Sequence, residues 1–496
     1  MSGNSKILQS AVLLTLANFA MRGVSMAFQV YLTDAVGAAG IGLLQLILTV
    51  NGFAVTVGTS GIRVAAMYLS AEEYGLRRLW GVKQAMSRCI ATGLILSALV
   101  GSLLALGAEL LAMHWIRDLR AAGSLRLLGL TLPLTCLNAI LSGYFTACGK
   151  IGRLVVTEIV DRLASVGLTL WLLRLGVEGD LSHGCLSIIG GSALASAGSA
   201  AALLVMMAAD LRKVSPSGEP LHMGARLRRF CIPVALNDYL RSGLGTLEQF
   251  LIPHGLSRWG GSRTTAMAEY GVIQGMVFPV MMFPSTILFA VSDLLVPRLA
   301  RCRAERNDLR TRSLTGRSLR AGTVFAASVG GLLYVLSEQL GVLLYDSADA
   351  ARYLRLFAPL VPILYLDCIV DGIHKGLGQQ IYCVRVNTLT NFLDVIGLFV
   401  LLPRFGVGGY FFTFAFTHVV NFYLSIHRLI RLTDLRPGVK FPAAAACAVG
   451  FAAGICRLLP NTVSWQTLWL RGGLYLLFLA LLLTLTGAVD KPSGVS

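Results

Sequence analysis

The sequence predicts an all-α polytopic membrane protein with about fourteen transmembrane helices. The first observation behind this prediction is composition. Hydrophobic residues make up 55% of the 496 residues, charged residues only 14%, and the mean hydropathy is +0.71. Soluble globular domains are less apolar and more charged. The second observation is a series of apolar runs of spanning length, and the third is the placement of basic residues in the short loops between them.

The apolar runs form two groups of six and a final pair. A helix needs about 20 apolar residues to cross the hydrocarbon core of a bilayer. A polar linker at 210–229 separates the two groups, so we expect an N-lobe at 1–209, a C-lobe at 230–428 and two C-terminal helices within 440–488. The expected spans, in chain order, are 7–33, 40–69, 85–112, 123–146, 153–175, 185–209, 230–254, 266–296, 318–345, 353–373, 380–402, 406–427, 440–458 and 466–488.

Loop charges support this map. With a cytoplasmic N-terminus, the loops on the inner side contain 24 Lys and Arg residues and those on the outer side contain nine. Cytoplasmic loops carry such an excess of positive charge. We therefore expect the Arg-rich segment 298–320 to be an inner loop, although in isolation it also suits an RNA-binding arm or an acidic-lipid patch. Both termini are then cytoplasmic.

The two groups of six spans resemble each other at an offset of 229 residues. An offset of six spans, an even number, gives the two halves the same orientation, related by an axis along the membrane normal. Transporters built this way bind their substrates between the lobes, near the midplane. The matched pairs are Gly42 with Gly271, Gln45 with Gln274, Gly143 with Gly372, and Gly149 with Gly378.

Arg22 lies in the middle of the first apolar run. Insertion scales put the cost of a charge at a helix centre at about 2.5–3.5 kcal/mol, so such a residue normally faces a partner or a watery cavity. A structural ion pair with another helix is one explanation, and a cation that awaits an anionic substrate is the other. Arg241 occupies the first span of the second half, and both arginines can hold phosphate oxygens through fork-shaped, charge-assisted hydrogen bonds.

Polar side chains accompany Arg241 along the seventh span. Asn237, Arg241 and Glu248 fall along one stripe of the helix. Glu248 is either a counter-charge that keeps an empty cavity from being too positive or a proton site. Together with Arg22 and the matched pair Gln45 and Gln274, these residues form the predicted substrate-binding set.

Several charged residues toward the predicted inner ends of spans are candidates for coupling or gating: Glu158, Arg162, Arg63, Asp293, Asp367 and Asp371. Glu158 and Arg162 are four residues apart and can pair on one helix face. Arg63 and Asp293 lie where a long side chain can reach water.

Two prolines, Pro279 and Pro284, interrupt the eighth span. An internal proline frees a backbone carbonyl and kinks a helix. We therefore expect the eighth span to bend during transport.

Signatures of enzymes are absent from the sequence. The seven histidines are dispersed, without an HExxH motif or a metal-spaced cluster. The segment GYFTACGKI ends like a phosphate-binding loop, but five residues separate its glycines and Ile151 replaces the required Ser or Thr. We expect no enzymatic activity, no cofactor and no bound metal, with transport coupled to the membrane potential, H+ or Na+.

Several segments give the chain a family resemblance. It resembles the stage V sporulation protein B type of polysaccharide exporter, which belongs to the MATE-like (multidrug/oligosaccharidyl-lipid/polysaccharide) flippase superfamily and is similar to the lipid II flippases. Gln29 departs from the pattern, since a basic residue is usual about seven positions after the first-helix arginine. The segments are MRGVSMAFQVYLTDAVGAAGIGLLQ, TSGIRVAAMYLSAEE, TEIVDR, LEQFLIP, YGVIQGMVFPVMMFP and GIHKGLGQ.

The resemblance implies a fold and a function. The fold is a V-shaped bundle of two six-helix lobes that alternates between inward-open and outward-open states. The function is movement of an undecaprenyl-linked sugar, a peptidoglycan precursor or a polysaccharide repeat unit, from the inner to the outer leaflet, in cell-wall synthesis or sporulation. By the family pattern, Arg22 corresponds to the first-helix arginine of the cavity, and Glu158, Arg162 and Glu248 fall on recurring positions.

Two other functions compete with a flippase. An ion-coupled multidrug exporter needs acidic residues deep in the lobes and few arginines, and a membrane-embedded glycosyltransferase needs a sizeable outer loop with acid-base residues. The expected partners are a lipid-linked glycan, the bilayer and cell-wall synthesis enzymes, with no nucleic acid. We expect a monomer in the bacterial plasma membrane.

Overall fold

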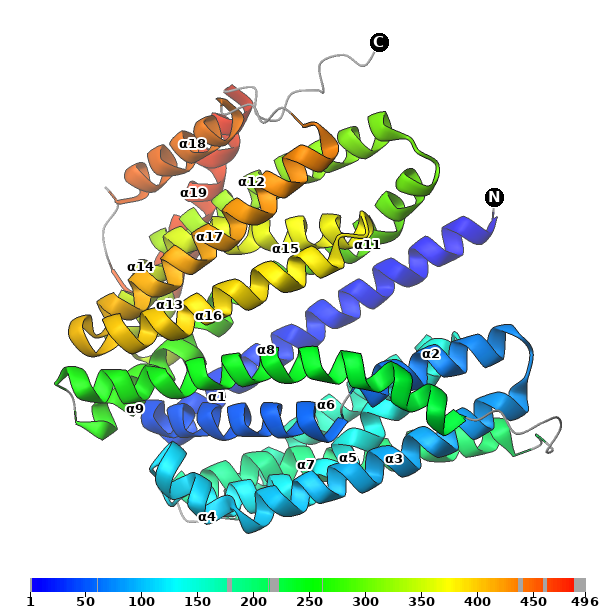
Figure 1. The fold of residues 1–496 in the computed structure, drawn as a ribbon. Helices are drawn as coiled ribbons and strands as arrows, with labels where there is room; N and C mark the ends of the chain where they lie inside the picture. The colour runs from blue at the N-terminus through cyan, green and yellow to red at the C-terminus, as the bar shows by residue number, and fades with distance from the viewer. Residues whose placement is uncertain are drawn as a thin grey trace. The chain divides into compact units, whose positions relative to one another are not determined.

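The computed structural model describes residues 2–59, 61–175, 181–212, 214, 223–260, 262–435, 440–457 and 462–485 (Figure 1). Every regular element in these residues is a helix, and none of them forms a strand. The all-α prediction is therefore confirmed. Contacts divide the chain into two compact units, a first unit of Ala35–Leu251 and a second unit of Met1–Asp34 with Ile252–Ser496.

The first unit consists of helices from the first half of the chain. Its boundaries fall inside two long helices, α1 (Ser2–Thr59) and α8 (Met223–Trp259). The helices between them are α2 (Ile62–Gly75), α3 (Leu79–Leu106), α4 (Ala108–Leu111), the π-helical η1 (Ala112–Ile116), α5 (Ala121–Ala147), α6 (Ile151–Arg174) and α7 (Leu181–Leu211).

The second unit contains the first half of α1, the end of α8 from Ile252 and the helices that follow. They are α9 (Arg263–Gly271), the π-helical η2 (Val272–Val277), α10 (Phe278–Met282), α11 (Ser285–Ala304), α12 (Asp308–Val335), α13 (Ser337–Tyr345), α14 (Ala348–Phe357), the 3-10 helix η3 (Ala358–Leu360), α15 (Val361–Gly376), α16 (Gln380–Phe405), α17 (Val407–Thr433), α18 (Lys440–Arg457) and α19 (Trp465–Leu485).

Eight of the described helices are long and apolar enough to cross a membrane, or nine if α9–α11 form one bent span. Helix α1 counts once, although its 58 residues rise about 87 Å, far more than one bilayer requires. Its backbone is non-helical at Gly37, where φ is 70°. Helices α6, with Glu158 and Arg162, and α8, with Arg241 and Glu248, do not pass this test. The count of fourteen spans stays a prediction.

The expected continuous span 40–69 is interrupted, and that expectation is wrong. Helix α1 ends at Thr59, and α2 begins after Gly61, whose φ of 72° lies in the left-handed region. Glycine adopts this conformation without a Cβ clash. Hydropathy averaged over a window does not register such a break.

The offset of 229 residues recurs in the backbone. Gly149 and Gly378 both have left-handed φ values, 70° and 68°. Helix α6 begins two residues after Gly149, and α16 begins two residues after Gly378. The hydrogen bonds that close the two turns match as well: Lys150 N–H donates to Phe145 O at 2.9 Å, and Gln379 N–H donates to His374 O at 2.8 Å.

Close helix contacts repeat at the same offset. A Cβ atom on Gly143 would lie 2.8 Å from the Arg63 carbonyl oxygen, and one on Gly372 would lie 3.3 Å from the Cα of Ser292. Ser292 is the position that the offset pairs with Arg63. Small residues let membrane helices approach closely in this way. The turn and this close contact therefore recur in both units at the predicted offset.

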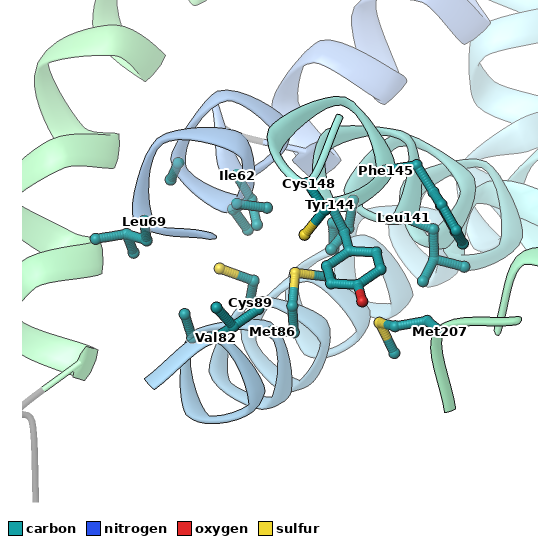
Figure 2. Packing of buried hydrophobic residues seen from close by; sticks show 14 of the residues in the cluster. Ile62, Leu69, Val82, Met86, Cys89, Leu141, Tyr144, Phe145, Cys148 and Met207 are labelled. Carbon is teal, nitrogen blue, oxygen red and sulfur yellow. The ribbon is translucent and has the colours of Figure 1, made fainter. Parts of the chain in front are cut away.

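A buried apolar cluster holds the first unit together (Figure 2). Ile62 and Leu69 from α2 face Met86 and Cys89 from α3, and Tyr144 from α5 packs against them. Because lipid tails are as apolar as these side chains, close packing rather than removal from water holds such helices together.

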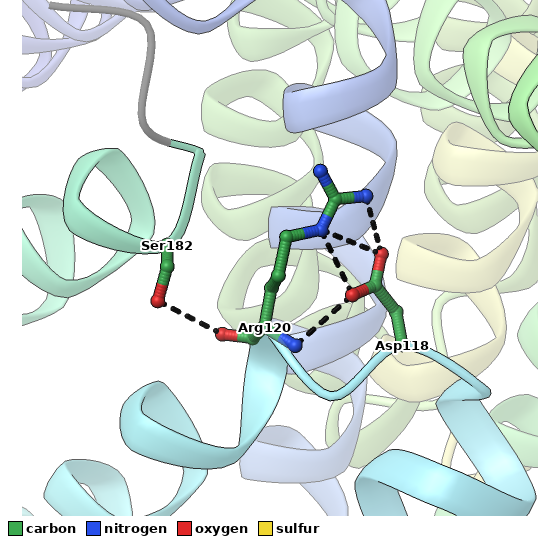
Figure 3. A network of polar contacts seen from close by, with 3 residues as sticks. All are labelled: Asp118, Arg120 and Ser182. Atoms are coloured by element: carbon green, nitrogen blue, oxygen red, sulfur yellow. Dashed lines mark hydrogen bonds and ion pairs between the residues drawn. The ribbon is translucent and has the colours of Figure 1, made fainter.

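A polar network joins the turn before α5 to the start of α7 (Figure 3). The Arg120 guanidinium donates to both carboxylate oxygens of Asp118, with a shortest distance of 2.7 Å, and the Arg120 N–H donates to the same carboxylate at 3.0 Å. The Ser182 hydroxyl donates to the Arg120 carbonyl at 3.4 Å. The Asp118 carboxylate thus stabilises the turn by binding both the backbone N–H and the guanidinium of Arg120.

The contact units and the predicted lobes differ at two helices. The first half of α1 belongs with the second unit, where Phe19 and Phe283 have ring centroids 5.2 Å apart. The part of α8 before residue 252 belongs with the first unit, where Arg226 forms an ion pair of 2.8 Å with the buried Glu73. The predicted lobes rest on the repeat in sequence and stay a prediction.

Candidate functional site

Arg22 is exposed on α1. Among the described residues, no carboxylate oxygen lies within 4.0 Å of its guanidinium, so the structural ion pair is not formed there. Its charge acts electrostatically on the Tyr365 hydroxyl of α15. A guanidinium of this kind can hold two oxygens of a phosphate group at once.

The span beside Arg22 is broken, as the two prolines predict. The segments Arg263–Met282 and Ser285–Ala304 meet at an angle of 56°. Pro284 has no N–H, so the carbonyl four residues earlier loses its helical donor. The hydroxyls of Ser285 and Thr286 donate to carbonyls at the break, to Met282 O at 2.6 Å and to Phe283 O at 2.7 Å, and Phe283 O also accepts the Thr286 N–H.

The Tyr365 hydroxyl enters the break. It donates to the Met281 carbonyl at 2.6 Å, and the backbone N–H of Ser285 interacts with the same hydroxyl. In a continuous helix Ser285 N–H would donate directly to Met281 O. A side chain inserted into the helical ladder is one of the recognised causes of a sharp kink. Tyr365 therefore stabilises the bend and is close enough to Arg22 to be affected by its charge.

A second freed carbonyl is bound by α1 itself. Pro279 lacks the N–H that would donate to Gly275 O, and the Gln29 amide donates to that oxygen instead, at 3.2 Å. Gly275 lies in the π-helical η2, and π-helical turns are frequent at functional sites. The residue that departs from the family pattern, Gln29, thus connects the Arg22 helix to the bent span.

Pro279→Ala is expected to reduce transport several-fold without reducing membrane insertion. The new N–H competes with Gln29 for the Gly275 carbonyl, because it restores the ordinary helical bond. The measurement is transport at matched membrane levels. Pro133→Ala, which changes a proline inside α5, is the control and is expected to transport normally. Wild-type transport by Pro279→Ala would remove Pro279 from the bending element.

The matched glutamines lie in different surroundings. Gln274 is half-buried in η2, and its amide donates to the Tyr410 hydroxyl of α17 at 3.3 Å. Gln45 is half-buried in α1, and its backbone carbonyl accepts a hydrogen bond from Thr49 at 2.8 Å. Their role in substrate binding stays a prediction.

In the first unit, the structure gathers the predicted gating charges. The Glu158 carboxylate interacts electrostatically with Arg63 of α2 and with Asp161 and Arg162 of its own helix, and Arg63 exerts the strongest effect of the three. The sequence predicted the pair of Glu158 and Arg162, but the partner from α2 follows only from packing.

The α8 residues are described in part. Arg241 is exposed, and no carboxylate oxygen within the described residues lies within 4.0 Å of its guanidinium. Glu248 is half-buried. The side chain of Asn237 lies outside the described residues.

The second unit contains one group of three carboxylates and one isolated buried carboxylate. Asp293 of α11 is exposed and joins Asp367 and Asp371 of α15 around Cys368. Asp394, which the sequence analysis missed, is buried in α16 and accepts a hydrogen bond of 2.7 Å from Thr417. An Asp within the apolar run 380–402 was the available signal, since intramembrane carboxylates are rare.

Comparison with known proteins is consistent with this geometry. Residues 7–303 match the polysaccharide biosynthesis protein family. The chain belongs to this family. Stage V sporulation protein B of Bacillus subtilis (strain 168) is 20% identical over 415 residues, which are 81% of this chain and 79% of that protein. The predicted family resemblance is confirmed.

Solved structures of two kinds share the fold. The lipid II flippase MurJ in an inward closed conformation aligns with a TM-score of 0.75 at 12% identity and covers 95% of this chain and 99% of its own. An inward-facing multidrug resistance MATE transporter aligns with a TM-score of 0.63 at 14% identity and covers 86% of this chain and 96% of its own. The family member described here therefore has the MATE-like fold and is a membrane protein.

Proposed function

We propose that this chain is a flippase that moves an undecaprenyl-linked sugar from the inner to the outer leaflet by alternating access. The observation that carries the proposal is Arg22, an exposed cation in a membrane-spanning helix with no carboxylate within 4.0 Å in the described residues. Such a residue needs an anion, and the pyrophosphate that links sugar to lipid is one.

The physical need for such a protein supports the proposal. A sugar pyrophosphate loses its hydration in hydrocarbon, whereas its prenyl tail does not. A cationic cleft allows the head group alone to pass while the tail stays in lipid. Membership of the polysaccharide biosynthesis family, and likeness to a protein titled lipid II flippase, agree with this substrate class.

The proposed cycle assigns a role to each predicted residue. Arg22 and Arg241 hold the pyrophosphate, and Glu248, Asn237, Gln45 and Gln274 line its path. The group of Glu158, Arg162 and Arg63, together with Asp293, opens and closes the inner side, and the bend at Pro279 and Pro284 changes the width of the cleft. Coupling to the membrane potential, H+ or Na+ supplies energy.

The setting of the protein follows from the same proposal. It is a monomer in the bacterial plasma membrane with both termini in the cytoplasm, as the excess of inner basic residues indicates. It acts on substrate delivered and consumed by cell-wall synthesis enzymes, and it catalyses no covalent reaction.

Reconstituted vesicles provide the test. The purified full chain is inserted into vesicles that contain an undecaprenyl pyrophosphate saccharide with a fluorophore on the sugar. An impermeant reductant is then added outside. Protein-dependent quenching of fluorophores from the inner leaflet is the expected result, and quenching that stops at the outer-leaflet fraction contradicts the proposal.

The same vesicles address the alternative, an ion-coupled multidrug exporter. They are loaded with a cationic dye, and an H+ or Na+ gradient is imposed. We expect no dye movement. Dye movement without saccharide movement would assign the chain to the multidrug class that shares its fold.

A further inference from the structure

A second cationic site lies in the second unit, where the ends of α12 and α18 meet α14 and α19. It is a cavity of about 300 Å³. This volume is at the lower end of the range for ligand pockets, roughly 300–1,000 Å³, and suits a small head group better than a saccharide. Its polar lining includes Tyr334, Glu338, Arg355, Arg457 and Arg471.

Two of the arginines flank one aromatic ring. The guanidinium carbons of Arg355 and Arg457 lie 5.4 Å and 5.0 Å from the centroid of the Tyr334 ring, and Arg457 also donates to the Tyr334 hydroxyl. Arg355 comes from α14 and Arg457 from the end of α18. Helices distant in sequence thus bring two like charges against the same ring.

The third arginine is buried. Arg471 lies in the membrane-spanning helix α19 and is only 5% exposed. A buried arginine in a spanning helix is rare and usually marks a functional site. The cavity therefore joins three guanidinium groups with a single carboxylate, that of Glu338.

This excess of positive charge requires an anion. Arg355 and Arg457 are exposed at the mouth of the cavity and Arg471 is buried in it, so like charges of which one is desolvated repel one another, and one acid neutralises only one of three. The Ser337 hydroxyl, also in the lining, already donates to the Tyr334 carbonyl at 3.0 Å. Planar guanidinium groups match the oxygens of a phosphate.

The cavity is separate from the Arg22 site. Phe325 of α12 stacks on Tyr365, the residue on which the Arg22 charge acts, with ring centroids 6.2 Å apart. Tyr334 follows nine residues later on the same helix, which is a rise of roughly 14 Å. An anion in one site therefore does not occupy the other.

We propose that this cavity binds a phosphate group, carried either by a lipid head group or as a free anion. The site is independent of the proposed flippase function, because its residues are not those that contact the Arg22 region. The predicted topology places it at the outer face of the membrane.

Native mass spectrometry of the detergent-purified full chain tests the proposal. The probes are short-chain phosphatidylglycerol, short-chain phosphatidylcholine and sodium phosphate. The test variant is Arg355→Gln with Arg457→Gln, and the matched control is Arg352→Gln with Arg404→Gln, which removes two exposed arginines of the same unit from outside the cavity. Arg471→Lys, which keeps the buried charge, is the second variant.

Each result has a defined meaning. We expect phosphatidylglycerol to bind the wild type and the control at least tenfold more tightly than the test variant. Binding of sodium phosphate with the same pattern identifies a free-anion site, and its failure beside bound phosphatidylglycerol identifies a lipid site. Equal binding to all variants, stronger binding of the zwitterionic phosphatidylcholine than of the anionic phosphatidylglycerol, or no binding of either phosphatidylglycerol or sodium phosphate overturns the proposal.

Discussion

Arg22→Ala is expected to reduce flipping of the lipid-linked saccharide by roughly ten- to a hundredfold. Hydrogen bonds to charged groups contribute about 1.5–3 kcal/mol each, and every 1.4 kcal/mol is a factor of about ten. Loss of the guanidinium removes at least one such contact from a site where the described residues offer it no carboxylate. The measurement is the quenching rate in reconstituted vesicles at equal protein content.

Two further variants make this result specific. Arg22→Lys keeps the charge but loses the fork of donors, so it is expected to transport at an intermediate rate. Arg404→Ala removes an exposed arginine at the end of α16 and is expected to leave transport unchanged. If Arg22→Ala transports like the wild type, Arg22 is only a structural charge.

The effect of Arg241→Ala separates a shared site from a single one. Arg241 is an exposed cation of α8, as Arg22 is of α1. If both arginines hold the same pyrophosphate, their contributions to transport are coupled. The transport rate of the double variant, Arg22→Ala with Arg241→Ala, is then expected to fall by less than the product of the two single-variant factors. Multiplicative losses would mean independent contacts.

Much of the fold follows from the sequence, because hydropathy and repetition are local or regular signals. The apolar runs locate the helices, and the offset of 229 residues predicts the paired turns at Gly149 and Gly378. One matched pair of glycines is weak evidence for a repeat by itself. In both turns, however, the residue after the helix end adopts a left-handed conformation, which favours glycine, so the match has a physical cause.

The positions where helices are interrupted are predicted less well from the sequence. The prolines predict that the eighth span bends, because a proline lacks the N–H that a continuous helix requires. The structure shows this bend, with an angle of 56°. The break at Gly61 was missed, since a glycine inside an apolar run is usually tolerated in a membrane helix. The two breaks also do not coincide in the repeat, so one half could not predict the other.

The partners of the candidate site could not be predicted. Gln29 binds a carbonyl 246 residues away, and Tyr365 binds one 84 residues away. Neither residue carries a charge. Gln29 lies in a family segment only as a departure from its pattern, and Tyr365 lies within an apolar run that hydropathy does not subdivide. Only the packing of α1 and α15 against the broken span reveals them.

Tyr365→Phe is expected to have the second largest effect, a loss of transport of about five- to a hundredfold. The change deletes one oxygen, and that oxygen is the hydrogen-bond partner of both Met281 O and Ser285 N–H at the break. An unsatisfied buried polar group costs about 1–3 kcal/mol, and this free energy lowers the population of the bent span by about five- to a hundredfold. The transport rate in vesicles measures it, and hydrogen exchange of the segment 281–287 reports on the bend itself.

Tyr475→Phe is the matched control for this prediction. The Tyr475 hydroxyl is also buried and also donates to a backbone carbonyl, that of Ser328 at 3.1 Å, but it joins α19 to α12 away from the break. Ser328 O keeps its helical donor within α12, so Tyr475→Phe is expected to lose less thermal stability than Tyr365→Phe and to leave transport and exchange at 281–287 unchanged. Equal transport by the two variants would show that the bend is a fixed feature of the fold, because a helix break that moves during transport must respond to the hydroxyl that holds it.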